Sequence, residues 1–261
     1  MSTLTVHRAT SVPPMATSSL LGVEARKMFN TRSGFWLLAG IVIAAVLATS
    51  ATILFAPRDE LTFNSFAAAI GVPMTIILPM IAVLSVSSEW SQRSALTTFT
   101  LVPSRSRVIA AKAVVTVAIG VISIVVAFAI GSLGNVIGSS IAGVDTVWDL
   151  NAREFSQIVL AHEVGMLMGF MFGLLFRSSA AAIVAYFVYA LALPGASEAL
   201  GGAKPWWAEN GAWFDHRWAV GRLFDDTLTG EMWVQVAVTT IVWLIVPLVV
   251  GWRMMLRSEV K

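Results

Sequence analysis

Long, uninterrupted apolar runs constrain this chain more than any other feature of its sequence. Hydrophobic residues make up 57% of the 261 residues and charged residues only 12%, whereas a soluble domain carries about 25% charged residues. Only helices and closed barrels satisfy the backbone polar groups inside a bilayer, and runs without strict alternation are typical of helices. The sequence therefore predicts an all-α integral membrane protein whose apolar surface is solvated by lipid.

Six apolar runs fit the ~20 residues that a transmembrane helix needs. Within a transmembrane domain over residues 35–252, we expect spans at Phe35–Ala56, Phe66–Val86 (interrupted by Pro73 and Pro79), Val108 to Ile130 with a continuation to Ile137, Phe155–Phe176, Ser179–Leu193 and Met232–Trp252. The fifth run is short and barely crosses a hydrocarbon core about 30 Å thick. This mismatch favours a re-entrant continuation after Pro194.

The charged residues are distributed unevenly between the two sides of these spans. With both termini inside, the inner segments hold 12 of the 17 Lys and Arg residues and 3 of the 15 acidic residues. The outer segments hold the other 5 basic residues and 11 acidic ones, and Glu163 lies within a span. Because Lys and Arg in short loops stay cytoplasmic, we expect a plasma-membrane protein with both termini, including the tail 253–261, in the cytoplasm.

The segment before the first span predicts an amphipathic helix. Residues 1–17 are polar, without the apolar run of a signal peptide, and we expect a flexible cytoplasmic N-terminus there. Within 18–34, Leu21, Ala25 and two further apolar residues share one helical face, with the charged residues elsewhere. Such a helix lies in the inner membrane interface. It serves either as a plain anchor or as a docking element for a cytoplasmic partner.

A polar segment, SSEWSQRSALTTFTLVPSRSR at 87–107, joins the second and third spans. Phe99 and two nearby apolar residues fall on one side of a short helix that Pro103 would end. Glu89 precedes Arg93 by four residues, a spacing that suits an ion pair on a helix. We expect a structured cytoplasmic elbow with a coupling helix that senses the movement of a soluble partner. The alternative is a basic loop that only satisfies the charge asymmetry.

Between the fifth and sixth spans, residues 195–231 form a second polar segment. Tryptophans are interspersed there with six acidic residues, and tryptophan prefers the membrane interface. We expect one or two short helices that lie on or dip into the outer leaflet. An ordinary tryptophan belt is the alternative.

Motifs for chemistry are scarce. The sequence contains no G-x-x-x-x-G-K-[ST] loop to bind the phosphates of a nucleotide. The segment HEVGM at 162–166 lacks the second histidine of a zinc-protease motif, and a chain with three histidines and no cysteine is a poor candidate for a metal site. We therefore expect no catalytic residues, no metal and no cofactor in this chain.

The fourth predicted span carries two features of its own. An ionisable residue within a span is a functional candidate by default, so His162 and Glu163, with Met166, either line a substrate path or form hydrogen bonds to a neighbouring helix. Three glycines at four-residue spacing allow a second helix to approach closely, within one chain or across a dimer: Gly165, Gly169 and Gly173.

Together these elements resemble the membrane subunit of type-2 ATP-binding-cassette exporters, particularly actinobacterial-looking members. The resemblance covers nearly the whole chain. It is carried by the basic helix EARKMFNTRS, the elbow SEWSQRSALTTFTLVPSRSRVIAAK and the final GWRMMLRSEVK.

The resemblance implies a non-catalytic permease in a bacterial plasma membrane, with no nucleic-acid partner. Two such subunits pair, substrate passes between them, and each binds a separate ATPase chain that holds ATP and Mg. The interfacial helix and the elbow contact that ATPase. Seven residues become candidate coupling residues: Glu24, Arg26, Lys27, Glu89, Arg93, Phe99 and Arg105.

The leading hypothesis is therefore export of a hydrophobic or amphipathic substrate driven by a separate ATPase. Two alternatives without an ATPase partner stay open. One is an intramembrane enzyme or secondary carrier, for which Glu163 is the one acid within a span. The other is a membrane-anchored assembly or immunity protein.

Overall fold

The structure is a computed structural model that describes residues 16–92, 104–224 and 227–257. Six helical stretches in these ranges are long and apolar enough to cross a membrane. They are α2 (Arg32–Phe55), α3 (Phe63–Ser91), α5 (Arg105–Ala142), α6 (Ala152–Phe176), the continuous stretch from α7 (Ser179–Phe187) to α8 (Leu193–Ala203), and that from α11 (Gly230–Thr240) to α12 (Val246–Arg257). The prediction of an all-α chain with six such helices is confirmed for these residues.

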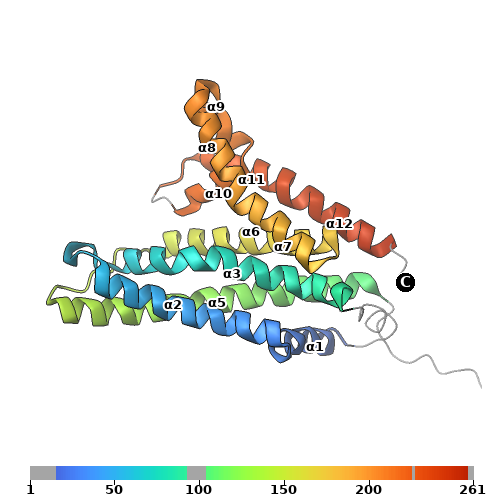
Figure 1. The fold of residues 1–261 in the computed structure, drawn as a ribbon, viewed down its shortest axis with the longest axis horizontal. Coiled ribbons are helices and arrows are strands. Elements are labelled where there is room, and N and C mark those ends of the chain that lie inside the picture. Colours follow the sequence, from blue (N-terminus) through green and yellow to red (C-terminus); the bar gives the residue numbers. More distant parts are fainter. Residues whose placement is uncertain (1–15, 93–103, 225–226, 258–261) are drawn as a thin grey trace, which may run out of the picture.

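Helices α2, α3, α5 and α6 run side by side as a bundle (Figure 1). Helix α3 lies at its centre and contacts α2, α5, α6 and α7. Apolar side chains on the inner face of α3 follow a four-residue spacing and are almost completely buried. They are Phe66, Ile70, Met74 and Leu78. Burial of this stripe makes α3 the element against which α2, α5, α6 and α7 pack.

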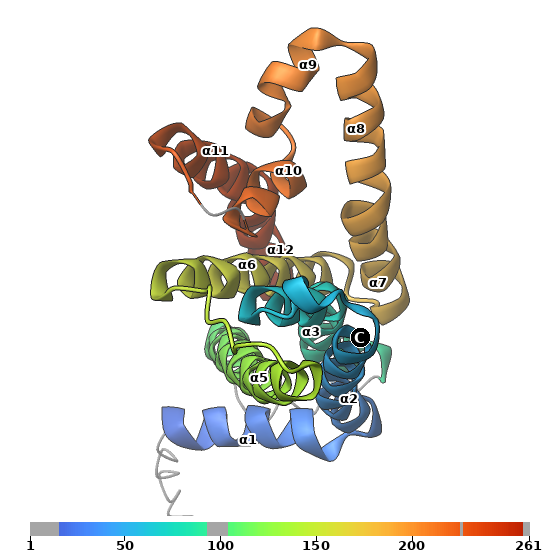
Figure 2. The same ribbon diagram turned by 90° about the vertical axis from the view of Figure 1, so that its left-hand side faces the viewer.

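A short helix, α1 (Thr17–Asn30), lies across one end of the bundle against α2 and α5 (Figure 2). The chain breaks at Thr31, which is extended and whose side chain accepts a hydrogen bond from the Gly34 backbone N–H. A side chain on Gly34 would overlap the Met28 carbonyl, so glycine permits this tight turn. The first span therefore begins at Arg32, three residues before the predicted start.

Helix α3 passes through Pro73 and Pro79 without ending, so the expected interruption is wrong. Proline has no N–H, and Pro79 therefore leaves the Thr75 carbonyl without its helical donor. The Tyr186 hydroxyl of α7 donates to that carbonyl at 2.5 Å. A hydrogen bond from another helix thus satisfies the proline site and ties α7 to α3.

The fifth span is longer than predicted. It continues from Ser179 to Ala203, so the expected end at Leu193 is wrong, whereas the re-entrant continuation after Pro194 stays a prediction. A π-helical segment, Val188–Ala192, lies immediately before the α8 turn that holds Pro194, and such local adjustments accommodate proline within a membrane helix. The sixth span contains a similar segment at Ile241–Ile245. Both stretches leave the α2–α6 bundle at an angle (Figure 1).

Two short helices, α9 (Pro205–Asn210) and α10 (His216–Gly221), connect the fifth and sixth spans. Helices α8 and α9 form a hairpin, and α10 leads back toward α11 (Figure 2). The short helices predicted in this segment are therefore present.

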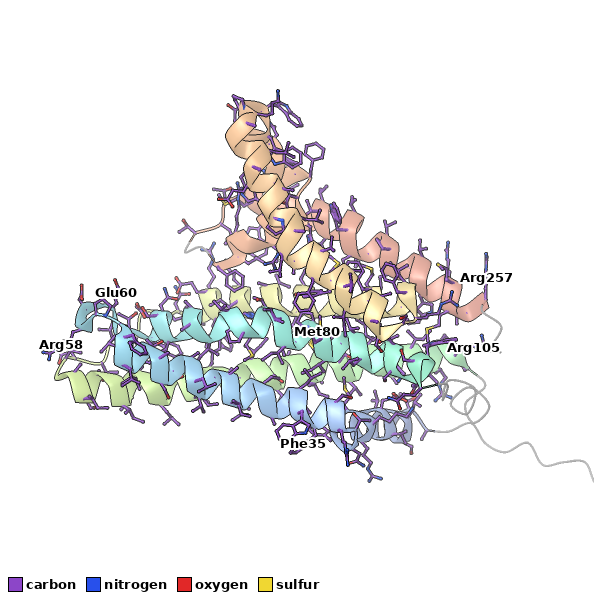
Figure 3. The ribbon with its side chains drawn as sticks, in the orientation of Figure 1. Phe35, Arg58, Glu60, Met80, Arg105 and Arg257 are labelled. Carbon is purple, nitrogen blue, oxygen red and sulfur yellow. The ribbon has the colours of Figure 1, made fainter. Side chains whose placement is uncertain are left out.

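The two ends of the bundle carry different charges. Arg58 and Glu60 lie at one end, and Arg105 and Arg257 lie at the other (Figure 3). The first of these ends also holds the loop 143–151, which is tied to α3 by a hydrogen bond from the Asn64 N–H to Asp149 Oδ1 of 2.8 Å. Helix α1 lies at the second end.

Candidate functional site

Four charged side chains meet where α1 crosses the ends of α3 and α5. Lys112 Nζ lies 2.6 Å from Glu24 Oε2 and 2.9 Å from Glu89 Oε1. Lys27 Nζ lies 2.8 Å from Glu24 Oε1 and 2.8 Å from Glu89 Oε1. Each ammonium therefore bridges the same two carboxylates, and three helices are joined by one closed arrangement that we call the ionic cluster.

The ionic cluster is largely shielded from solvent. The side chains of Glu24 and Lys112 are 3% and 4% exposed, whereas Lys27 is 38% exposed at the edge. Lys112 also donates to the Ser85 carbonyl at 3.1 Å, so its three N–H groups have three acceptors. Buried charges persist only when they are paired in this way.

The charge state of Lys27 follows from its neighbours. Burial alone lowers the pKa of its ammonium. The hydrogen bonds and charges of Glu24 and Glu89 outweigh burial and raise the pKa of Lys27 above its usual value. Lys27 therefore keeps its positive charge throughout the physiological pH range.

The buried face of α1 includes Glu24, which the sequence pattern placed away from the apolar face. Leu20, Glu24 and Met28 face the protein, whereas Phe29 is 54% exposed. Glu24 turns inward because Lys112, within the apolar helix α5, requires a counter-charge. Sequence reasoning did not select Lys112 as a site residue. A lysine enclosed by apolar residues, as in VIAAKAVV, is the signal that identifies such a position.

Three of the predicted coupling residues, Glu24, Lys27 and Glu89, therefore contact one another and Lys112 inside the chain. Arg26 is exposed on α1. The remaining three are Arg105, the first residue of α5, and Arg93 and Phe99, which precede it in the sequence. Arg105 Nη1 donates to the Met255 carbonyl at 3.4 Å. Arg93 and Phe99, with the predicted coupling helix and the Glu89–Arg93 pair, lie outside the described residues.

The His162 ring lies near two backbone carbonyls, and a neutral imidazole, which has one N–H, donates to one of them. Its Nδ1 lies 2.8 Å from the Ile158 carbonyl of its own helix, and its Nε2 lies 3.4 Å from the Gly71 carbonyl of α3. The edge of its ring also packs against Phe224, with the ring centroids 5.5 Å apart. Of these contacts, a hydrogen bond to the Gly71 carbonyl is the one that the helix-bonding interpretation of His162 requires.

Glu163 has a different environment. Its side chain is buried, and neither carboxyl oxygen has a hydrogen-bond partner among the described residues. Glu163 and Met166 both face Gly120 of α5, where a side chain would overlap them. An unpaired acid at this depth is costly. Of the residue pair singled out in the fourth span, Glu163 is therefore the stronger functional candidate.

The glycine ridge of α6 packs inside the chain. A Cβ on Gly169 would lie 2.9 Å from Pro79 Cα, and one on Gly173 would lie 3.0 Å from the Val83 carbonyl oxygen. Gly165 is less crowded, with Pro79 Cγ 4.0 Å away. The ridge thus allows α6 to approach α3 closely, which is the intrachain alternative of the two left open by the sequence.

Helices of this length and apolarity define the class of this chain as a multi-pass, all-α membrane protein. Among the described residues, no group of three His, Asp or Glu side chains is placed to hold a metal ion. In comparisons with known proteins, no protein-family model and no curated protein matches the chain.

Proposed function

We propose that this chain is the membrane subunit of an ATP-driven exporter, on which a separate ATPase chain acts at the end that carries α1. The observation that carries the proposal is the ionic cluster. It joins α1 to the end of α3 and the start of α5, and these are the two helices that flank the predicted elbow. A displacement of either α1 or the elbow would therefore be transmitted to both spans.

Helix α3 then spreads such a displacement through the bundle, because it packs against α2, α5, α6 and α7. Close-packed interfaces transmit strain instead of absorbing it. The exposed apolar residues Val23, Phe29 and Trp36 would lie among lipid headgroups and acyl chains at the inner interface. In this proposal the partner supplies ATP hydrolysis and Mg, and a second copy completes the path for a hydrophobic or amphipathic substrate.

The direct test is purification of the tagged chain in mild detergent from its native host, followed by mass spectrometry. The proposal expects a nucleotide-binding subunit at a 1:1 ratio.

A variant of the exposed residue Arg26 tests the proposed contact surface on α1. Arg26→Glu should weaken retention of that subunit, whereas Arg58→Glu, at the opposite end of the bundle, should not. Equal retention in both variants contradicts a partner surface on α1.

One observation favours a second candidate, a proton-coupled secondary carrier. Glu163 is a buried acid without a hydrogen-bond partner among the described residues, and acids in such positions mark proton relays in transporters. Reconstituted vesicles separate the two functions. Transport driven by a proton gradient without ATP, and abolished by Glu163→Gln, would support the carrier. Transport that requires the ATPase subunit would support the exporter.

A further inference from the structure

A cavity of about 450 Å³ lies between α8, α9 and the α10 turn, apart from the ionic cluster and from Glu163. Pro194 and Glu198 contribute to its α8 wall. Asp215, Arg217 and Trp218 line the opposite side. The cavity thus presents one positive group, two carboxylates and an aromatic ring.

The guanidinium of Arg217 has no counter-charge among the described residues. Its side chain is half-buried, and its Nε is buried without a hydrogen-bond partner among the described residues. No carboxylate of the described part of the chain lies within ion-pair distance of it. An unsatisfied charged donor costs more than a neutral one. Because Arg217 lines the cavity, an anionic group there would supply the missing counter-charge of its guanidinium.

The rest of the cavity wall is held in place. Asp215 Oδ1 accepts a hydrogen bond of 3.1 Å from the backbone N–H of Trp218, and this bond caps the start of α10. The Trp218 ring packs on Gly211, where an added Cβ would overlap the ring. Glu198 is exposed on the neighbouring α8. The charged groups are therefore presented by a fixed turn and by a continuous helix.

The two charge signs limit which ligands fit. A ligand with only negative charge would be repelled by Glu198 and Asp215, and a simple cation would be repelled by Arg217. A ligand with an anionic group next to a cationic one satisfies both. Arginine binds phosphate through several N–H groups at once, and a primary ammonium can donate hydrogen bonds to carboxylates.

The surface around the cavity is apolar and exposed. Leu193 and Leu200 of α8 are 37% and 46% exposed. Trp206 and Phe214, on the α9 side, are 58% and 51% exposed. Because α8 continues a stretch that is apolar enough to cross a membrane, acyl chains of a lipid would lie along it.

We propose that this cavity binds the headgroup of a zwitterionic phospholipid with a primary amine, with its phosphate on Arg217 and its ammonium toward Glu198 and Asp215. The lipid's acyl chains lie along α8. The site is independent of any ATPase partner, so it stands or falls separately from the proposed exporter function.

The test is native mass spectrometry of the full chain in detergent, titrated with dioleoyl-phosphatidylethanolamine. Phosphatidylglycerol with the same acyl chains lacks the ammonium and tests whether that group is needed. Phosphatidylcholine carries a quaternary ammonium without N–H groups and tests whether those hydrogen-bond donors are needed. Both should bind about tenfold or more weakly, since hydrogen bonds to charged groups are worth at least that factor. Water-soluble phosphoethanolamine tests whether the acyl chains are needed and should compete poorly.

Arg217→Gln and Glu198→Gln should each weaken phosphatidylethanolamine binding about tenfold, and Arg217→Lys should retain part of it. The matched controls Arg58→Gln and Glu209→Gln, outside the cavity, should bind as the unchanged chain does. Circular dichroism would verify that each variant is folded. Unaltered binding by folded Arg217→Gln, or equal binding of phosphatidylglycerol, would overturn the site. Equal competition by phosphoethanolamine would overturn its assignment to a lipid.

Discussion

Lys112 shows how a single residue within an apolar helix organises its surroundings. Its ammonium has three acceptors: Glu24, Glu89 and the Ser85 carbonyl. The sequence alone placed Glu24 away from the apolar face of its helix, because a helical wheel treats each helix separately. The counter-charge that turns Glu24 inward comes from α5, far along the chain, and no local pattern contains it.

Lys112→Met should destabilise the chain by about 3 to 5 kcal/mol, because it leaves Glu24 and Glu89 buried with Lys27 as their shared partner. Thermal unfolding in detergent measures this as a lower Tm. The matched control Lys204→Met, on the exposed end of α8, should leave the Tm unchanged.

The double variant Lys112→Met with Glu24→Gln extends this prediction. Removal of one carboxylate with the ammonium should cost less than the sum of the two single changes, because the residues share one network. A strictly additive loss would mean that Lys112 and Glu24 are not coupled, and an unchanged Tm in Lys112→Met would mean that the ionic cluster contributes no stability.

His216, at the start of α10, gives the connecting segment a pH dependence. Burial lowers the pKa of its imidazole from 6.5 to about 4, and the charge of Arg217 adds to this effect, while Asp215 opposes it. The unfolded chain takes up this proton near pH 6.5 and the folded chain only near pH 4. Stability from neutral His216 is therefore complete above about pH 6.5 and is lost as the pH falls toward 4.

We expect the Tm of the unchanged chain to fall between pH 7.5 and pH 5 by more than that of His216→Gln, because the variant has no imidazole to protonate. Differential scanning fluorimetry at the two pH values measures the difference. Parallel falls in both proteins would assign the pH dependence to other groups.

Among the helices, the pairing of α3 with α7 depends on contacts that the sequence does not display. Pro73, Pro79 and Pro194 each predict a break or an end, yet both helices continue. At Pro79 the reason is a hydroxyl from another helix, and at Pro194 it is a π-helical segment just before it. The apolar runs are a local property of the sequence, and their number and order were predictable.

Tyr186→Phe should lower stability by about 1 kcal/mol, because the Thr75 carbonyl loses its donor. In a Pro79→Ala background the backbone N–H of residue 79 can supply a donor. The same Tyr186 change should then cost less, which chemical denaturation of the four proteins in a double-mutant cycle would measure. An equal cost in both backgrounds contradicts this role of Tyr186.

The contact between α3 and α6 predicts a difference between neighbouring glycines. Gly169→Ala should cost about 1 to 3 kcal/mol, because its Cβ would collide with the Pro79 backbone. Gly165→Ala, with its nearest neighbour 4.0 Å away, should be close to neutral. Unfolding midpoints of the two variants in detergent test the difference, and equal midpoints would exclude close packing at Gly169.

At the scale of the whole molecule, the sequence predicted the number of spans and a strong charge asymmetry. The structure gathers α1, Arg105 and Arg257 at one end of the bundle, with Arg58 and Glu60 at the other. It did not follow from the sequence that the fifth and sixth spans leave the bundle at an angle. That direction depends on how these helices pack against other helices, which the pattern of a single helix does not specify.

The central claim is that the end with the ionic cluster faces the cytoplasm, where an ATPase can reach it. The chain contains no cysteine, so Arg26→Cys and Arg58→Cys each provide a unique thiol at opposite ends. A membrane-impermeant maleimide applied to intact cells should label Arg58→Cys and should label Arg26→Cys only after permeabilisation. Labelling of Arg26→Cys in intact cells, with protection of Arg58→Cys, would place α1 outside and contradict the account.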